Sequence, residues 1–496
     1  MKKSKQAKAS ECEVGVDMIS NLPDPVLQLI LSRLQGTEEV IRTSILSKRW
    51  RYLWTSVPSI DIDYTRRLKP SKIFKKNRFK DFVYWVLLNK TLDLDSFRLW
   101  CSNYYNMSTI RQWIHVAVMR KVKLLDLMFC SREESEDIEV PHCLVTCSSL
   151  EVLRLCLFEC ALCLPSITGF PALRVLELNN VRLEKCDLVK RFLESFPLLE
   201  ELSLIDCIVF EWQDLCISSP KLKNLRIENH YEETGECCYT RKYSRIEISC
   251  PKLVFLKLAG NVAMRFRFGT LYSLKEAVIH ITDLYEAEEQ LDTFEYFDEI
   301  SHVEYLSINI YCIKWCFDPT VDISVSLPNL KTLEQTVHAY NFMNTLIPIL
   351  TRLPDLESFH LIIPKDAYVL KYWKLDDAET MRVLTHHLKK VKFLEFDEDK
   401  PKLDLARALL EHGHALEEMV FCWADETRFR EKSMETMNQL SKFHKASSSV
   451  KLRCIINPSQ ANSNPAQNIL EIDSIQAESS SCSSNSSVKL LGRGSS

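Results

Sequence analysis

Residues 150–178 read LEVLRLCLFECALCLPSITGFPALRVLEL and contain the pattern L-x-x-L-x-L twice, beginning at Leu150 and Leu173. Thirteen copies of this pattern, with other apolar residues allowed at the leucine positions, begin between Leu94 and Leu416. The twelve steps between them span 322 residues, which is about 27 residues per step. A constant period of this length predicts that one supersecondary unit is stacked many times.

The period falls inside the ~20–29-residue window of leucine-rich repeats. A single copy cannot bury its own leucines, whereas stacked copies form one continuous core. Proline stands two residues before the first leucine in several copies, for example at Pro171, Pro220 and Pro251, where it ends the preceding segment before a strand starts. We therefore predict an α/β fold in which residues 91–382 form an irregular leucine-rich-repeat solenoid.

The fifth residue of each copy is expected to point away from the core, onto the concave face, because side chains alternate along a strand. These residues are Arg98, Asp126, Arg154, Glu177, Ser203, Arg226, Lys257, Val278, Ser307, Glu334, His360, Lys392 and Val420. Their mixed charges favour a protein ligand with interspersed charges over a polyanion or polycation. The candidate target-binding residues are Arg154, Glu177, Arg226, Lys257 and Glu334, with the acidic stretch 283–300 as a rival surface.

A second apolar pattern lies near the start, where residues 17–54 read DMISNLPDPVLQLILSRLQGTEEVIRTSILSKRWRYLW. Leu27, Ile30, Leu31 and Leu34 follow the spacing of a buried helical stripe after two prolines. Two further short helices are expected, and Asp24 and Thr37 are the expected caps. A three-helix module of this size has more apolar surface than it can bury, which indicates a partner site.

The strings ISNLPD (19–24), LILSRL (29–34) and TSILSKRWRYLW (43–54) resemble the F-box of plant F-box/leucine-rich-repeat proteins. The segment 35–40 departs from that family, which more often has a lysine and an alanine there. The resemblance implies that the module, residues 16–62, docks on a Skp-type adaptor and through it on a cullin. The positions that match for adaptor binding are Leu22, Pro23, Leu27, Ile30, Leu31, Val40, Leu46 and Trp50.

Residues 63–90 are interpreted as a basic connector and a docking helix. The run 66–80 holds eight Lys or Arg residues and no acid. We take it as a solvated linker, with a nuclear-import patch as the alternative. Phe79, Val83 and Val86 follow at helical spacing and predict a helix that docks the F-box onto the repeats.

Residues 383–455 place a helix, marked by Leu403, Ala406, Leu409 and Leu410, between two strand-like copies. This order of elements resembles the FBD module that closes many plant F-box proteins. Physically, such a module can cap the exposed end of a solenoid. Residues 1–15 and the Ser-rich residues 456–496 are expected to be disordered.

Composition excludes several classes of function. The net charge is −4, and the nine glycines of the 496-residue chain cannot form a dinucleotide, Walker or nucleophile-elbow motif. The cluster Cys143, Cys147, Cys156, Cys160 and Cys163 lacks a second correctly spaced pair, so plain thiols are favoured over a metal site. We expect no catalytic residue, metal or cofactor. Neither a membrane span nor a secretory signal is evident, so cytoplasm or nucleus is expected, and nucleic acid is not favoured as a partner.

The sequence therefore predicts a non-catalytic substrate receptor of a Skp–cullin–F-box ubiquitin ligase. The F-box would bind the adaptor, and the repeats would hold an unidentified target protein close to the transfer chemistry of other subunits. Two alternatives remain open. One is a small-molecule sensor that uses the solenoid as its ligand site, and the other is an adaptor-binding scaffold without a role in degradation.

Overall fold

The described residues of the computed structural model form two compact units: unit 1 comprises residues 1–181 and 195–198, and unit 2 comprises 182–194 and 199–496. The structure describes residues 19, 22–34, 36–63, 76–101, 107–129, 138–158, 160–163, 169–183, 196–210, 214–230, 239–240, 243–281, 299–309, 327–336, 353, 355–362, 388–398, 400–456 and 469–473. Each of the thirteen predicted copies supplies one β-strand. The repeat prediction is therefore confirmed.

Unit 1 begins with the predicted small helical module. Its elements are α1 (Asp24–Ser32), α2 (Thr37–Arg42), a 3₁₀ turn η1 (Thr43–Ile45), α3 (Trp50–Leu53) and a 3₁₀ turn η2 (Trp54–Ser56). Both cap predictions are wrong. Asp24 lies inside α1 and forms an ion pair with Arg49 (2.5 Å), and Thr37 lies inside α2, where its hydroxyl accepts the backbone N–H of Asp61 (2.7 Å).

The sheet of unit 1 begins earlier than the first predicted copy. Its parallel strands are β1 (Ser59–Asp63), β2 (Ser96–Cys101), β3 (Leu124–Phe129), β5 (Val152–Cys156) and β7 (Val175–Asn179). The short strands β4 (Ile138–Glu139) and β6 (Leu162–Cys163) pair separately. The helix predicted after the basic run is present as α4 (Lys76–Asn89), and it connects β1 to β2.

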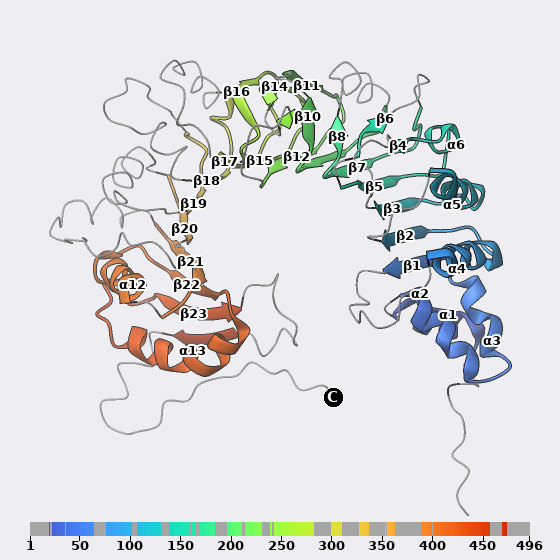
Figure 1. Ribbon diagram of the computed structural model, residues 1–496. Helices are drawn as coiled ribbons and strands as arrows, with labels where there is room; N and C mark the ends of the chain where they lie inside the picture. Colours follow the sequence, from blue (N-terminus) through green and yellow to red (C-terminus); the bar gives the residue numbers. More distant parts are fainter. Residues whose placement is uncertain are drawn as a thin grey trace, which may run out of the picture. The chain divides into compact units, whose positions relative to one another are not determined.

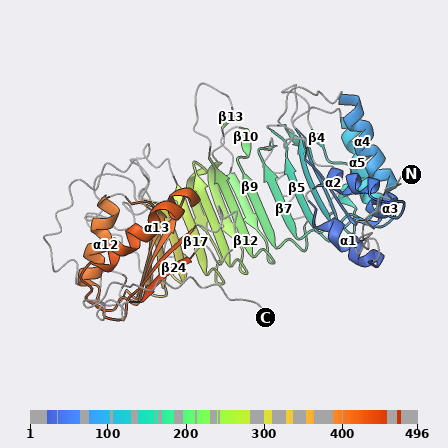
Figure 2. The same ribbon diagram turned by 90° about the horizontal axis from the view of Figure 1, so that it is seen from below.

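Helices cover one side of these strands. α4 and α5 (Met107–Met119) lie side by side, and the short α6 (His142–Val145) follows (Figures 1 and 2). Val83 and Val86 of α4 and Trp113 of α5 are at most 1% exposed beneath the alternating leucines of the strands. The other side of the strands, here called the open face, carries the intervening polar side chains.

A buried lysine joins the end of the helical module to the first repeat. Lys90, 3% exposed, donates from Nζ to the carbonyl oxygens of Trp54, Val57 and Ser59 at 3.0, 2.8 and 3.1 Å. Its ammonium also lies 5.6 Å from the centre of the Trp54 ring. Three carbonyls around one ammonium group satisfy all three of its N–H donors.

Burial lowers the pKa of Lys90 from 10.5 to about 8. Below pH 8 the folded and unfolded chains both hold this proton, whereas between pH 8 and 10.5 only the unfolded chain does. Folding stability is therefore expected to rise with pH across that window, by an amount on the order of 3 kcal/mol. Denaturant midpoints at pH 8, 9 and 10 should rise for the wild type relative to Lys90→Met. Parallel pH profiles for the two proteins would contradict the assignment.

Unit 2 continues the same architecture. Its parallel strands are β9 (Glu201–Ile205), β12 (Asn224–Asn229), β15 (Phe255–Gly260), β17 (Glu276–Ile281), β18 (Tyr305–Asn309), β19 (Thr332–Thr336), β20 (Ser358–Ile362), β21 (Lys390–Phe396), β22 (Glu418–Trp423) and β23 (Lys451–Ile456) (Figure 2). Two small sheets accompany them, β11 (Asp214–Ser218) with β14 (Tyr243–Ser249) and β16 (Ala263–Phe268), and β8 (Arg182–Leu183) with β10 (Ile208–Phe210) and β13 (Tyr239–Thr240).

The C-terminal part of unit 2 contains two helices between strands. The predicted helix is present as α12 (Lys400–His412), between β21 and β22. A second helix, α13 (Glu426–Ser441), is capped by Asp425 and lies between β22 and β23. A last strand, β24 (Ile469–Asp473), pairs antiparallel with β23 inside the range expected to be disordered; its sequence ILEID has three apolar residues in five, two of them β-branched, which is typical of a strand. The rival acidic stretch 283–300 lies almost wholly outside the described residues.

Candidate binding surfaces

The helical module exposes a group of large apolar side chains. Leu29 of α1 is 58% exposed, Ile45 of η1 is 88% exposed and Leu46 is 63% exposed. Val26, Ile30 and Leu34 are 37–41% exposed. A cluster of exposed apolar residues on so small a module is typical of a protein–protein interface.

The eight candidate adaptor-binding residues divide into two groups. Pro23, Ile30 and Leu46 are exposed, and Leu22 is half-buried. The other four are 0–6% exposed and form the module's own core: Leu27, Leu31, Val40 and Trp50. These four are therefore reassigned to internal packing. Helical spacing showed that the segment had two apolar sides, but it could not show which side faces the module itself.

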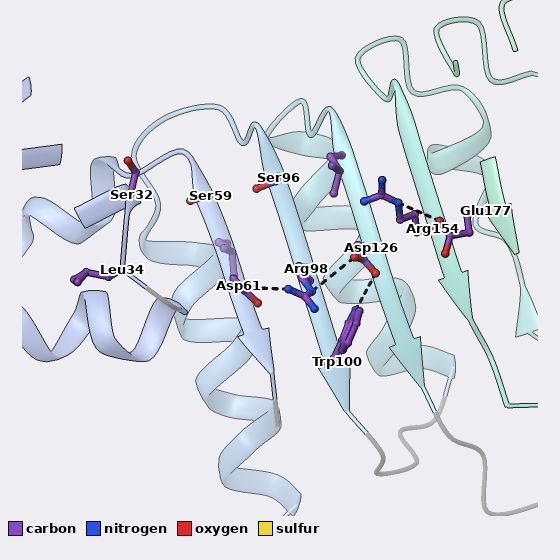
Figure 3. A pocket seen from close by; sticks show the side chains of 12 residues that line it. Ser32, Leu34, Ser59, Asp61, Ser96, Arg98, Trp100, Asp126, Arg154 and Glu177 are labelled. Atoms are coloured by element: carbon purple, nitrogen blue, oxygen red, sulfur yellow. Dashed lines mark hydrogen bonds and ion pairs between the residues drawn. The ribbon is translucent and has the colours of Figure 1, made fainter. Parts of the chain in front are cut away.

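The open face of unit 1 carries a ladder of alternating charge. The strand register aligns five charged residues, one from each of five neighbouring strands: Asp61, Arg98, Asp126, Arg154 and Glu177 (Figure 3). Arg98 lies 3.7 Å from a carboxylate on either side, and Arg154 lies 3.4 Å from Glu177. Two of the predicted target-binding residues, Arg154 and Glu177, thus lie in one charge-paired row, and its first member, Asp61, was not predicted.

These residues line a cleft of about 590 Å³, to which Ser32 at the end of α1 and Leu34 just after it also contribute (Figure 3). Inside it the Arg98 guanidinium stands 3.8 Å from the centre of the Trp100 ring. The Trp100 indole N–H donates to Asp126 at 2.9 Å. Unit 1 therefore shows an arginine held between an aromatic ring and carboxylates.

The open face of unit 2 carries the other three predicted residues. Lys257 forms an ion pair with the 7%-exposed Glu228 at 2.9 Å. Arg226 is exposed, with its guanidinium 5.8 Å from the centre of the Phe255 ring. Arg226 and Lys257 are register neighbours on β12 and β15, whereas Glu334 lies further along the sheet on β19.

Glu334 is the centre of a hydrogen-bonded cluster. Its Oε2 accepts from the Tyr305 hydroxyl at 2.7 Å, and its Oε1 accepts from the Ser307 hydroxyl at 3.0 Å. His360 Nδ1 lies 3.5 Å from Oε2, and His280 Nε2 lies 2.8 Å from Ser307 Oγ. Because the Ser307 proton is used toward Glu334, His280 must donate from Nε2. Tyr305 and His280, which occupy the third and seventh positions of their copies, were not among the predicted residues.

Burial and hydrogen bonding set the ionisation of this cluster. Burial alone would raise the pKa of Glu334, but hydrogen bonds from His360, Tyr305 and Ser307 lower it below its ordinary value, so the carboxylate stays charged at neutral pH. Burial lowers the pKa of His280, which keeps that ring neutral. The pKa of Tyr305 is raised, first by burial and then by the neighbouring Glu334 charge. The cluster therefore presents a charged carboxylate that hydrogen bonds hold in one orientation.

One row of contacts in this cluster has the order of a catalytic triad, with Ser358 in the place of the nucleophile, His360 in that of the base and Glu334 in that of the acid. Ser358 Oγ is 3.1 Å from His360 Nε2. Acyl transfer further requires N–H donors beside the nucleophile that can stabilise an oxyanion. The Ser358 N–H already donates to Lys331 O at 2.9 Å, and the strand's other N–H groups serve its two neighbours. This arrangement therefore favours binding over nucleophilic catalysis.

The cysteine cluster stands apart from these surfaces. Cys147 and Cys160 are buried, and Cys143, Cys156 and Cys163 are half-buried. Within the described parts of the chain, no three His, Cys, Asp or Glu residues converge as metal ligands. None of the described helices combines the length and apolarity needed to cross a membrane.

Comparison with known families agrees with this architecture. The family described as "At1g61320/AtMIF1, LRR domain" matches residues 87–471, and the F-box domain matches residues 19–61. This chain belongs to the plant F-box/FBD/leucine-rich-repeat proteins. The F-box/FBD/LRR-repeat protein At3g52680 of Arabidopsis thaliana is 27% identical over 460 residues, covering 90% of this chain and 95% of the relative.

Two further Arabidopsis thaliana relatives match over different lengths. The FBD-associated F-box protein At5g22730 is 24% identical over 82% of this chain and 88% of its own length. The F-box/FBD/LRR-repeat protein At1g78750 is 32% identical over 53% of this chain, and the match spans 57% of the relative. An F-box generally binds a Skp1-type adaptor, and F-box proteins with leucine-rich repeats are in general non-catalytic substrate receptors.

Proposed function

We propose that this F-box/FBD/leucine-rich-repeat protein is the target-recognition subunit of a Skp–cullin–F-box ubiquitin ligase, acting in the cytoplasm or nucleus. The exposed apolar side of the F-box, centred on Leu29, Ile45 and Leu46, carries the proposal, because it supplies a docking surface for the adaptor. The open face of the repeats supplies a second, polar surface for a target protein. The reaction itself belongs to other subunits, and this chain contributes proximity.

The charge ladder of unit 1 gives a test of target binding. Arg154→Glu places like charges in register on β3, β5 and β7, and we expect at least a tenfold loss of target affinity, or about 1.4 kcal/mol. The measurement is binding of a target identified by proximity labelling with the full-length protein. Arg226→Glu is the corresponding change in unit 2.

The swap Arg154→Glu/Glu177→Arg is the control for the pair between β5 and β7, because it keeps an ion pair between positions 154 and 177 while still placing a glutamate in register with Asp126. A target that reads charge positions should bind both variants weakly. If the swap restores binding, the single change acts through repulsion between positions 154 and 177. If both variants bind as well as the wild type, this face of unit 1 is not the target site.

The cleft beside α1 supports a second candidate, a receptor whose target binding depends on a small molecule. Its volume of about 590 Å³ falls within the ~300–1,000 Å³ of ligand pockets. Its lining is rich in charged side chains, which favours a polar ligand. Target capture that requires a dialysable factor from plant extract would support this candidate, and capture by purified components alone would exclude it.

A further inference from the structure

Glu334 differs from the other well-covered carboxylates on the open-face strands. Asp126, Glu228 and Glu418 have side chains that are 13, 7 and 19% exposed, and each forms an ion pair with an Arg or Lys residue. Their partners are Arg98 for Asp126, Lys257 for Glu228, and both Lys390 and Arg453 for Glu418. Glu334 is 17% exposed, and its only ion-pair partner among the described residues is His360. A charged carboxylate with this much burial ordinarily has a full cationic partner.

The cluster holds the Glu334 carboxylate in one orientation. Tyr305 and His360 meet Oε2, whereas Oε1 accepts, among the described residues, only the Ser307 hydroxyl. A carboxylate oxygen has two lone pairs, so Oε1 keeps acceptor capacity for one more donor. The hydroxyl end of the Tyr305 ring points at Oε2, and the His360 ring meets the Tyr305 ring in a T-shaped contact with 6.4 Å between the ring centres. An aromatic ring and an oriented carboxylate are the two groups that bind a guanidinium ion well.

Taken together, the geometry points to Glu334 and Tyr305 as a binding site for an arginine side chain of the target protein. This inference rests on the proposed role of the open face in target binding. The carboxylate would accept the guanidinium N–H donors at Oε1, and the phenol ring would lie against its planar surface. An anionic ligand such as a phosphorylated residue is disfavoured, because it would approach an ionised Glu334.

Unit 1 already contains an arginine that is bound by an aromatic ring and by carboxylates of this chain. There Arg98 lies over Trp100 and between Asp61 and Asp126. In unit 2 the aromatic ring and the carboxylate are present, but the register neighbours of Glu334 are Ser307 and His360 instead of an arginine. The arginine that unit 1 supplies from its own strand would come to unit 2 from the partner.

The test uses the full-length protein with its adaptor and two probes, N-acetylarginine amide and the uncharged isostere N-acetylcitrulline amide. Ligand-observed NMR should detect binding of the arginine probe and at least tenfold weaker binding of citrulline. Glu334→Gln should weaken arginine binding at least tenfold, because it keeps the shape and removes the charge. Glu201→Gln is the control, since Glu201 is exposed on β9, which belongs to the same sheet but is separated from the strands of Tyr305 and Glu334 by several others.

Three outcomes overturn the inference: equal binding of both probes, unchanged arginine binding by Glu334→Gln, or no arginine binding by the folded wild type. A fall in thermal midpoint for Glu334→Gln without any probe binding by the wild type would identify the cluster as purely structural. Adaptor binding and the Arg154 variants are measured separately. Their success would show that failure at Glu334 leaves the proposed function standing.

Discussion

Changing Ile45 and Leu46 together to aspartate is expected to lower affinity for a Skp-type adaptor at least a hundredfold. The two side chains are 88% and 63% exposed on the F-box, so a partner that covers them would have to bury two charges. Truncation of an interface anchor alone costs ~2–4 kcal/mol, and each 1.4 kcal/mol is a factor of ten. Co-expression with the adaptor followed by a binding titration measures the effect.

The control for this change is Tyr272→Asp, which alters a 79%-exposed apolar residue in unit 2 and should leave adaptor binding unchanged. Leu22→Ala/Pro23→Ala should give a smaller loss, because Leu22 is only half-exposed. Circular dichroism checks that each variant stays folded. Wild-type affinity in the folded Ile45→Asp/Leu46→Asp protein would show that this side of the F-box is not the docking surface.

The F-box illustrates what a sequence pattern can and cannot predict. The apolar spacing in residues 17–54 correctly predicted short helices with surplus apolar surface. It did not separate Leu27 and Leu31, which are fully buried, from Leu29 and Ile45, which are exposed. In a segment of so few turns both sides of a helix are apolar, and only the packing of the three helices decides which one remains open.

The repeats were predictable for a different reason. Each leucine of L-x-x-L-x-L must face the core, so the thirteen strands and their inward side follow from the pattern. The polar clusters could not be predicted from the same pattern, because they join residues at different positions of different copies. Tyr305 and Ser307 of one copy, His280 of the copy before it and Glu334 of the copy after it meet only because their strands are neighbours in the sheet.

Elements with weak patterns were missed. β1 has the sequence SIDID, in which two isoleucines replace the longer motif. The buried side of α13 includes Ser433 and Thr436 beside Phe429, Met437 and Leu440, which dilutes its apolar stripe. Both elements are held by neighbours: β1 pairs with β2, and α13 packs on β23. Packing against these neighbours therefore stabilises a strand and a helix whose own apolar patterns are weak.

Lys402→Met is expected to destabilise the C-terminal part of unit 2 by about 3–5 kcal/mol. Lys402 Nζ lies 2.7 Å from Asp397 Oδ1, and the two side chains are 3% and 5% exposed. The ammonium also donates to Glu395 O at 3.2 Å. Removing the lysine leaves the Asp397 carboxylate buried without its counter-ion, and breaking a buried ion pair in this way costs about that much.

The double change Asp397→Leu/Lys402→Met separates the pair's net value from the penalty of an orphaned charge. Replacing both partners by apolar side chains removes the attraction together with the cost of burying two ions, so the double variant should recover most of the lost stability. Urea midpoints of the wild type, Lys402→Met and the double variant measure this difference. A double variant as unstable as Lys402→Met would mean that the lysine acts through the Glu395 carbonyl and its aliphatic packing instead of through Asp397. Recovery would mean that this part of the fold needs the ion pair to be complete or absent, and that the net contribution of the pair to the free energy of unfolding is small.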